Sequence, residues 1–229
     1  MSLFAVSQPG SLLEAFTEEV ESLGGGVTDS FEHNDNLYVR STLDLEREVS
    51  RGDKLRAGIA LRASLEDIRV HPYVFRLVCS NGAIFAQATQ TRVISLHDPC
   101  FDPTDAVREA VRCCAQPGAF EESLLQTRGA MEREADLMLL YLPLLARVSS
   151  QHLRSIFDMI VQRLEQGRDR TRFGLMNAVT STARDTKDPE LRWRLEELGA
   201  MVPALRKETP VARESKRALR VPDDTLVPV

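Results

Sequence analysis

The chain lacks a hydrophobic run long enough to cross a membrane. Its longest apolar stretch, residues 137–146, has ten residues and contains Pro143, whereas a membrane-spanning helix needs roughly 20 residues. The first residues also lack the basic start and the long apolar centre of a secretory signal. We therefore expect a soluble cytoplasmic protein without a membrane partner, whose four cysteines are reduced.

The sequence also lacks the glycine patterns that hold nucleotides. The triple glycine at 24–26 has neither the spaced glycines and following helix of a dinucleotide fingerprint nor the Gly-Lys-Ser/Thr of a phosphate loop. It reads as a turn or hinge. No cofactor is expected.

Lysine is scarce, because 25 of the 29 basic residues are arginine. Arginine suits bidentate phosphate contacts and stacking on bases, although a GC-rich genome produces the same bias. The net charge of −5 removes the simplest argument for nucleic-acid binding, a strongly basic chain. Only residues 206–229 are basic on balance, with six basic and four acidic residues.

The composition predicts a folded protein of moderate size. With 43% hydrophobic and 28% charged residues among 229, the chain has enough apolar material for a sizeable core. We expect a single α+β domain over residues 1–205, strand-rich over 27–102 and helical over 103–205. Prolines alternate with charges from residue 206 onward, which predicts a flexible basic tail over 206–229.

Period-two apolar patterning separated by turn residues predicts an N-terminal antiparallel β-sheet. Strands so closely spaced in sequence are typical of a meander. The expected strands cover residues 27–33, 37–43, 55–64, 68–79 and 83–96.

The pair Asn81-Gly82 lies between the last two apolar runs. Both residue types tolerate positive φ, so the pair predicts a two-residue type I′ hairpin turn. Such a turn would set Cys79 opposite Ile84. An alternative is a helix over 72–81, with Pro72 at its first position and Gly82 just beyond its end.

Helical periodicity dominates the remainder and predicts a helical layer after the sheet, hence the α+β class. A short N-terminal helix is also expected over 11–23, with Ser11 as its N-cap and the triple glycine at its end. The other expected helices cover residues 104–115, 121–146, 150–166, 172–185 and 189–201.

Four blocks, residues 51–53, 58–64, 73–82 and 177–180, occur in the order seen in a known family. The chain resembles the phage- and plasmid-associated "domain of unknown function 932" family over about Val27 to Met201. The block Arg-Leu-Val-Cys-x-Asn-Gly is its most specific part. Ala83 departs from the methionine frequent in the family, and the segment between Ser64 and Ile68 is short. The resemblance implies a gene carried by mobile elements, without an established catalytic activity.

No group of residues has the spacing of a catalytic or metal site. His97, Asp98, Cys100, Cys113 and Cys114 are enough ligands for zinc, but adjacent helical cysteines project about 100° apart. We expect reduced core cysteines and no metal. Cys79 has no histidine with a predictable place beside it, which favours packing over nucleophilic catalysis. The acids in 32–35 could hold Mg²⁺ in a nuclease, yet this segment is typical of a turn.

Arginines recur along the expected strands, together with tyrosines. An exposed sheet face of this kind grips phosphates and stacks bases in many single-strand binders; its alternative is a solvated face whose arginines pair with acids. The candidate nucleic-acid-binding residues are Arg40, Arg56, Arg62, Arg69, Arg76, Arg92, Tyr38 and Tyr73.

The leading hypothesis is therefore a non-catalytic protein of a mobile element that binds nucleic acid. Single-stranded DNA during replication or recombination is the favoured ligand, and the protein could form a homo-oligomer. The second hypothesis is a protein-interaction or host-modulating factor that binds no nucleic acid. A metal-dependent enzyme is the third.

Overall fold

The structure is a computed structural model, and it describes residues 9–96 and 102–205. It has the α+β architecture expected from the sequence, with an antiparallel sheet in the N-terminal half and a helical C-terminal half. The basic tail at 206–229 and the residues His97, Asp98 and Cys100 lie outside the described residues.

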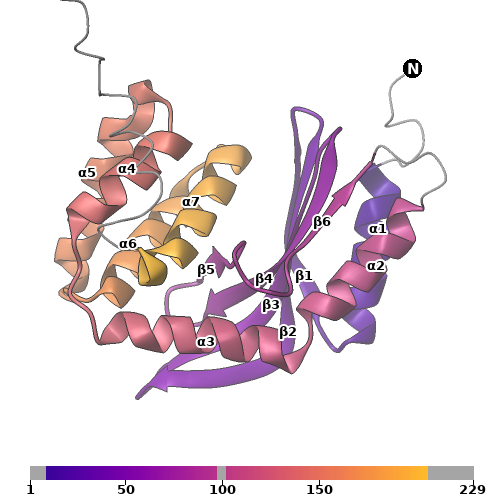
Figure 1. Ribbon diagram of the computed structural model, residues 1–229, viewed down its shortest axis with the longest axis horizontal. Helices are drawn as coiled ribbons and strands as arrows, with labels where there is room; N and C mark the ends of the chain where they lie inside the picture. Colours follow the sequence, from indigo (N-terminus) through magenta and orange to yellow (C-terminus); the bar gives the residue numbers. More distant parts are fainter. Residues whose placement is uncertain (1–8, 97–101, 206–229) are drawn as a thin grey trace, which may run out of the picture.

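The sheet is an antiparallel meander that curls through the middle of the molecule (Figure 1). Strands β1 to β5 pair in sequence order, and β6 pairs with β4 beside β5. Strand β4 is therefore paired along both halves of one edge: its residues 73–76 with β5 and its residues 67–70 with β6. The strands are β1 (Gly26–His33), β2 (Asn36–Ser50), β3 (Asp53–Ala63), β4 (Asp67–Arg76), β5 (Asn81–Ile84) and β6 (Arg92–Ser95).

Helices cover both faces of the sheet (Figure 1). Two of them, α1 and α2, pack together on one face, while α7 faces the other. Helix α3 runs from the sheet towards α4 and α5, which stand at the end of the molecule away from α1 and α2. The helices are α1 (Pro9–Ser22), α2 (Pro103–Cys114), α3 (Pro117–Met131), α4 (Leu137–Arg147), α5 (Ser150–Gly167), α6 (Arg172–Asp185), α7 (Pro189–Met201) and the short 3₁₀ helix η2 (Val202–Ala204).

Strand alternation explains how one sheet serves two layers. On β2, Leu37 and Val39 belong to the large apolar core, whereas Tyr38 and Arg40 project from the opposite face. Trp193 of α7 packs with Tyr38 and Tyr73 on that second face. None of the helices among the described residues is long and apolar enough to cross a membrane.

The N-terminal helix begins earlier than expected. It starts at Pro9, so Ser11 lies inside α1 and is not its N-cap. Pro9 fits the first turn of a helix because its missing N–H would have no intrahelical partner there. The helix ends as expected before the triple glycine, where Gly24 has a φ of 77°.

The Asn81-Gly82 pair does not form the turn that the sequence predicts. Residues 77–80 make the turn, Ser80 has a φ of 50°, and Asn81 and Gly82 are the first residues of β5. Gly82 pairs with Phe75, and Asn81 pairs with Arg76. The strand expected through this region is confirmed up to Arg76, which rules out the alternative helix over 72–81.

Gly82 is required by close packing instead of by a turn. A Cβ atom on Gly82 would lie 1.9 Å from the Tyr73 hydroxyl oxygen, and Gly82 is not among the residues with positive φ. The turn chemistry expected at Asn81-Gly82 occurs between β1 and β2, where Asn34 and Asp35 have φ values of 48° and 57°. This confirms that residues 32–35 include a turn.

Two expected elements are divided. The strand expected over 83–96 becomes β5 and β6, because residues 85–91 leave the ladder before the chain pairs with β4 again. The helix expected over 121–146 becomes α3 and α4, separated at 132–136. There Ala135 N donates to Arg170 O at 2.8 Å, so the backbone bonds to another segment and not to the preceding turn. Pro143 lies inside α4 and does not end it.

Gly82→Ala should lower the free energy of unfolding by roughly 1–3 kcal/mol, because the new methyl group overlaps the Tyr73 ring. Gly82→Asn should be at least as damaging. If Gly82 occupied a turn with positive φ, asparagine would be tolerated better than alanine. Urea unfolding of both variants decides between the two explanations. Gly129→Ala in α3 is the control: no atom lies within 4 Å of its Cβ position, so it should be neutral or stabilising.

Candidate protein-interaction surface

The arginines of the sheet do not share one face. Arg40, Arg56, Arg62 and Arg69 project towards the side that α7 covers, because each is paired across the strands with residues of that face. Arg76 is paired with Leu55, and Arg92 with Val70, both of which belong to the opposite core. A signal for this was present in the sequence, since Arg69 and Arg76 are seven residues apart on one strand and must point to opposite faces.

The expectation of an exposed face of arginine and tyrosine is wrong for three residues. Tyr38, Arg40 and Tyr73 are 0%, 1% and 3% exposed. Trp193 covers them, and its ring centroid lies 5.9 Å from that of Tyr38. No base can stack on either tyrosine while α7 occupies this position.

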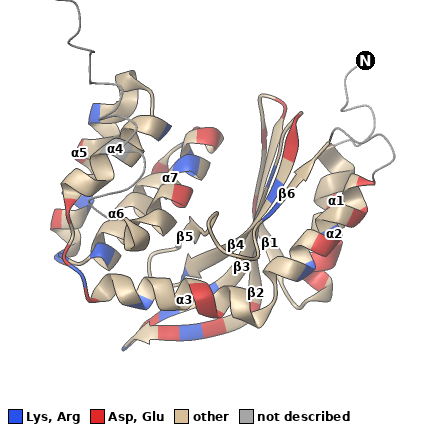
Figure 2. Ribbon diagram, in the orientation of Figure 1, with Lys and Arg blue, Asp and Glu red and all other residues tan. Residues whose placement is uncertain are grey.

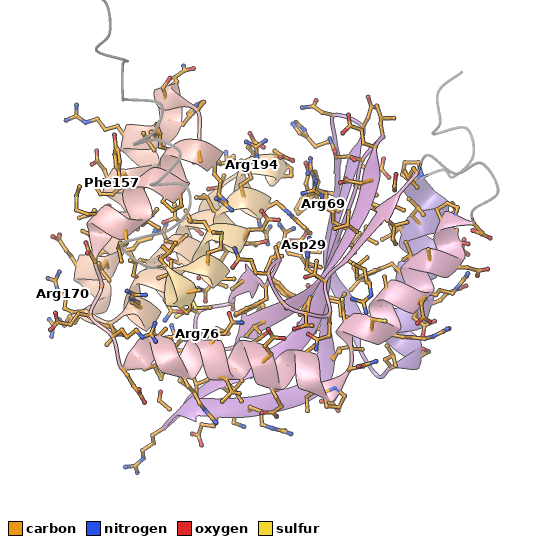
Figure 3. All side chains as sticks on the ribbon, viewed as in Figure 1. Asp29, Arg69, Arg76, Phe157, Arg170 and Arg194 are labelled. Atoms are coloured by element: carbon orange, nitrogen blue, oxygen red, sulfur yellow. The ribbon has the colours of Figure 1, made fainter. Side chains whose placement is uncertain are left out.

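A buried ionic network explains how arginine is accommodated beneath α7. Arg40 Nε donates to Glu196 Oε2 at 2.7 Å, and Arg40 Nη1 lies 3.7 Å from Asp29 Oδ1. Arg192 bridges the same two carboxylates, at 2.8 Å from Asp29 and 3.1 Å from Glu196. Figure 3 shows Asp29 and Arg69 of the sheet and Arg194 of α7 in the region between the two layers. The network neutralises Arg40 and joins α7 to β1 and β2.

A second network lies nearer the edge of the same contact. Glu190 accepts hydrogen bonds from the Tyr38 hydroxyl and from Arg194, and Arg62 Nη2 is 3.1 Å from Glu190 Oε2. Burial, followed by the bond to Glu190, raises the pKa of Tyr38 to about 12. The Tyr38 hydroxyl is therefore a hydrogen-bond donor at neutral pH and not a free acid or base.

Among the residues that the structure describes, the other sheet arginines also have local carboxylate partners, with one exception. Arg56 bonds to Glu46, Arg69 Nη2 is 2.8 Å from Asp67, and Arg76 Nη2 is 2.6 Å from Asp53. Arg92 instead donates to the backbone carbonyls of Thr89 and Thr91. Figure 2 accordingly shows basic and acidic segments close together along the β2–β3 hairpin. Nucleic-acid binding by these residues stays a prediction.

The four blocks on which the expected family resemblance rests meet in space. Asp53 of the first block bonds to Arg76 of the third, and Asn81 Nδ2 of the third block donates to Thr180 of the last at 2.5 Å. Gly58 of the second block lies against Tyr73. These contacts give the blocks a role in packing. Beside them is a cavity of about 190 Å³, lined in part by Arg76, Cys79, Arg163, Asn177 and Ser181.

The cysteines of the described chain are not arranged as a metal site. Cys114 is buried, and its thiol lies 3.6 Å from Val70 O and 3.2 Å from Gln90 O. Burial raises its pKa to about 12, so it is a neutral thiol. Cys79 lies in the turn after β4, 3.3 Å from Arg76 Nη1. No cluster of three potential metal-ligating side chains occurs within 9–96 and 102–205.

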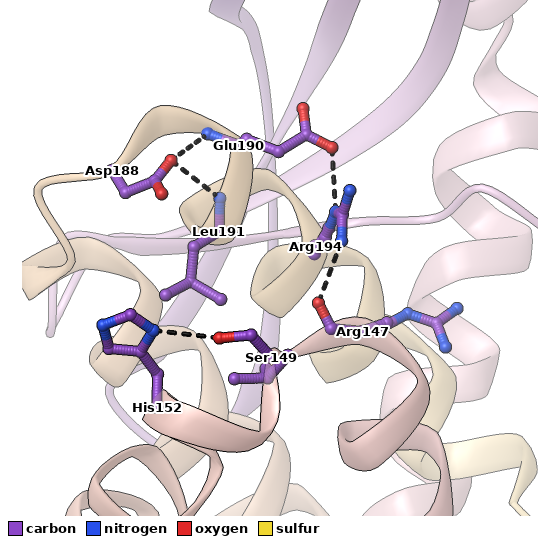
Figure 4. Close-up of a pocket in the computed structure, with 8 residues that line it drawn as sticks. Arg147, Ser149, His152, Asp188, Glu190, Leu191 and Arg194 are labelled. Atoms are coloured by element: carbon purple, nitrogen blue, oxygen red, sulfur yellow. Dashed lines mark hydrogen bonds and ion pairs between the residues drawn. The ribbon is translucent and has the colours of Figure 1, made fainter.

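A cavity of about 170 Å³ lies where α4 ends and α5 and α7 begin. Figure 4 shows the residues that line it. It contains a serine and a histidine, with Ser149 Oγ 3.0 Å from His152 Nδ1. Asp188 does not complete a catalytic triad, because its Oδ1 caps α7 by accepting from Glu190 N and Leu191 N. Arg194 Nη1 donates to Arg147 O at 3.1 Å. The bond between Arg194 and Arg147 therefore joins α7 to the end of α4. Asp188 does not orient His152 as a base for Ser149.

Helix α4 carries the only cluster of large exposed apolar residues on a single helix or strand of the described chain. Met138, Tyr141 and Leu145 are 76%, 41% and 44% exposed, whereas Leu140 and Leu144 on the other side of the helix are fully buried. Their spacing of three and four residues places them on one stripe. The other large exposed apolar residues, Leu23, Phe31, Leu65, Val78, Val93 and Leu125, occur singly.

Helix α5 extends this stripe through one aromatic contact. The ring of Phe157 lies 6.1 Å from that of Tyr141 in an edge-to-face arrangement. Phe157 is half-buried and lies on the side of α5 away from the sheet (Figure 3). We call Met138, Tyr141, Leu145 and Phe157 the α4–α5 face. This apolar run was expected to be the last part of a helix over 121–146 and is too short for a membrane span; the exposed stripe on it was not expected.

Comparisons with known proteins give no relative. No protein-family model, curated protein or solved structure matches the chain. The resemblance to the 932 family therefore stays a prediction.

Arg40→Met should lower the free energy of unfolding by roughly 1.5–3 kcal/mol, because the buried Glu196 carboxylate would lose its hydrogen bond from Arg40 and keep only the one from Arg192. Arg92→Met is the matched control. It removes an exposed guanidinium that has no carboxylate partner within residues 9–96 and 102–205, and it should change stability by less than about 0.5 kcal/mol. Chemical unfolding measures both; equal effects would contradict the assignment of Arg40 to the core.

His71 should make the fold sensitive to acid. Burial, with a smaller effect of Arg69, lowers its pKa from 6.5 to about 4. As the pH falls, the unfolded chain binds this proton before the folded chain does. The contribution of His71 to the free energy of unfolding is therefore fully present above pH 6.5 and decreases by roughly 3 kcal/mol as the pH drops towards 4. His71→Gln should remove that part of the pH dependence. Unfolding at several pH values checks this, and a profile of His71→Gln equal to that of wild type would contradict it.

Proposed function

We propose that the protein is a non-catalytic binding protein whose α4–α5 face holds a protein partner. One observation carries the proposal: three large apolar side chains form a continuous stripe on α4 that is exposed to solvent. Single exposed apolar residues are ordinary, but grouped ones mark interaction sites. Helix-in-groove and helix-to-helix recognition use this spacing of apolar anchors.

The surroundings of the face suit a rigid binding surface. Leu140 and Leu144 anchor α4 in the core, and its C-terminal carbonyl at Arg147 accepts a hydrogen bond from α7. Asp136 caps the helix by accepting from Met138 N at 3.0 Å. A partner would therefore meet a preformed helix, so little ordering of this chain is required on binding.

Single-stranded DNA binding in a mobile element is the second candidate. The partial exposure of Arg69 on β4 and Arg194 on α7 favours it, because their side chains are 42% and 46% exposed. Arg92 also has no carboxylate partner within the described residues. A titration of single-stranded DNA over a salt series tests it. Binding that weakens steeply with salt, with a shallower slope in Arg69→Met/Arg92→Met, would support it. No binding at low salt would remove it.

The protein-binding proposal predicts cross-linked adducts in living cells that produce the full chain. A photoreactive benzoylphenylalanine in place of Tyr141 should yield adducts with a polypeptide, because this ring is 41% exposed at the centre of the stripe. The same replacement at Leu125, which is 66% exposed on α3, is the control. The adducts should disappear when Met138→Glu is added. Adducts equally abundant at both positions, or none at Tyr141, would contradict the proposal.

A further inference from the structure

A cavity of about 190 Å³ lies where the end of β4, helix α5 and helix α6 meet. Its lining includes Arg76 and Cys79, from the end of β4 and the following turn, and no residue of the α4–α5 face belongs to it. An engineered cavity of about 150 Å³ in another protein holds benzene. This cavity therefore has room for a small organic molecule.

Small side chains on α6 leave this space open. One side of the helix lines the cavity at spacings of three and four residues, through Gly174, Asn177, Ala178 and Ser181. Another wall includes Leu164 of α5, and both Leu164 and Ala178 are 3% exposed. An apolar wall with a few polar groups is the usual composition of a site for a small ligand.

Arg163 lines the cavity with most of its hydrogen-bond donors unused. Its Nη2 atom lies 2.6 Å from Asp185 Oδ2, and its Nε and Nη1 atoms have no partner among the residues that the structure describes. Arg184 Nε lies 3.0 Å from the other oxygen of the same carboxylate. One carboxylate thus pairs with two guanidinium groups, and one positive charge remains beside the cavity. The Arg163 side chain is 23% exposed, so salt screens it less than a fully exposed charge.

Asn177 is the second group of the cavity with a free donor. Its side-chain amide is half-buried and has no hydrogen-bond partner within the described part of the chain. Each side-chain nitrogen of Arg76, in contrast, already has a partner, because Nε and Nη2 donate to Asp53 and Nη1 donates to Cys79. The nitrogen donors left for a ligand are therefore those of Arg163 and Asn177.

Asp169 limits the charge that a ligand can carry. Among the described residues it is the only carboxylate that lines the cavity. It lies beside Gly174, near the start of α6, whereas Arg163 pairs with the last residue of that helix. Arg168 and Arg170 flank Asp169 in the sequence, but both are exposed and neither lines the cavity; Figure 3 shows Arg170 at the outer edge of the molecule. One negative charge on a ligand is therefore attracted to Arg163, and a second would be repelled by Asp169.

We propose that this cavity binds a small monocarboxylic acid in its ionised form. The carboxylate accepts hydrogen bonds from Arg163 and Asn177, and the apolar part of the acid packs against Leu164 and Ala178. A guanidinium suits a carboxylate because two of its N–H groups match the two oxygens. The site is distinct from the α4–α5 face and does not depend on the proposed protein-binding function.

An NMR titration of the isotope-labelled full chain with acetate, propionate and butyrate, at constant ionic strength, tests the class of ligand. Affinity should rise about fourfold with each added methylene group, because each one is buried against the apolar wall. Succinate and inorganic phosphate should bind at least about tenfold more weakly than butyrate at about pH 8, where each carries a second negative charge that Asp169 opposes. Butyrate that leaves the signals of the lining residues unchanged, or that binds no better than phosphate, would overturn the proposal.

Three variants locate the site. Arg163→Met should weaken butyrate binding at least about tenfold, because it removes the charged donor. Ala178→Leu should prevent binding by filling the cavity. Arg168→Met, which removes an exposed arginine outside the lining, should bind butyrate like wild type. Circular dichroism confirms folding of each variant, and equal affinities of Arg163→Met and Arg168→Met for butyrate would reject the site.

Cys79 gives a second measurement on the wild-type chain, because it lines the cavity. Butyrate should slow the alkylation of Cys79 by iodoacetamide several-fold, as measured by mass spectrometry of the peptide that contains it. Cys113 on α2 is the matched control, since it is also a half-buried free thiol and does not line the cavity. Its alkylation should not change. Equal slowing at both cysteines, or none at Cys79, would show that butyrate does not occupy the cavity.

Discussion

The buried contact between Arg40 and Glu196 determines how the two halves of the molecule fit together. Arg40 is on β2 and Glu196 is on α7, 156 residues later. A guanidinium that is 1% exposed is tolerated only with carboxylate partners, because removing one charge of such a pair leaves the other buried and unpaired. The position of α7 over the sheet follows, and with it the burial of Tyr38, Tyr73 and Trp193.

That constraint changes what the arginines mean. Arginine on a sheet is suited to phosphate, but here each guanidinium that faces α7 already has a carboxylate within reach. Arg40 and Arg62 therefore join the sheet to α7, whereas Arg56 and Arg69 pair with carboxylates of the sheet itself. The uncovered apolar material lies elsewhere, on α4, where the helix packs one side on the core and leaves Met138, Tyr141 and Leu145 outside. Folding thus covers the sheet face beneath α7 and leaves the outer side of α4 exposed.

Packing also gives glycine and asparagine roles that turn chemistry does not suggest. Gly82 lies against the Tyr73 ring, and Asn81 reaches Thr180 of α6. Both residue types favour tight turns in general. Here the packing against Tyr73 requires that Gly82 has no side chain, and the contact with α6 requires the amide donor of Asn81. The real turn, at residues 77–80, uses Ser80 at positive φ.

The sequence by itself determined the α+β class, the antiparallel order of β1 to β4, and helices α5, α6 and α7 nearly to the residue. These features depend on local periodicity and on helix caps such as Asp188, and both are set by residues close together in the sequence. Only the tertiary structure decided which arginines are free, because Glu190 and Glu196 come from a helix remote in the sequence. It also decided the exposure of α4, since an apolar run reads the same whether its outer side is buried or open to solvent.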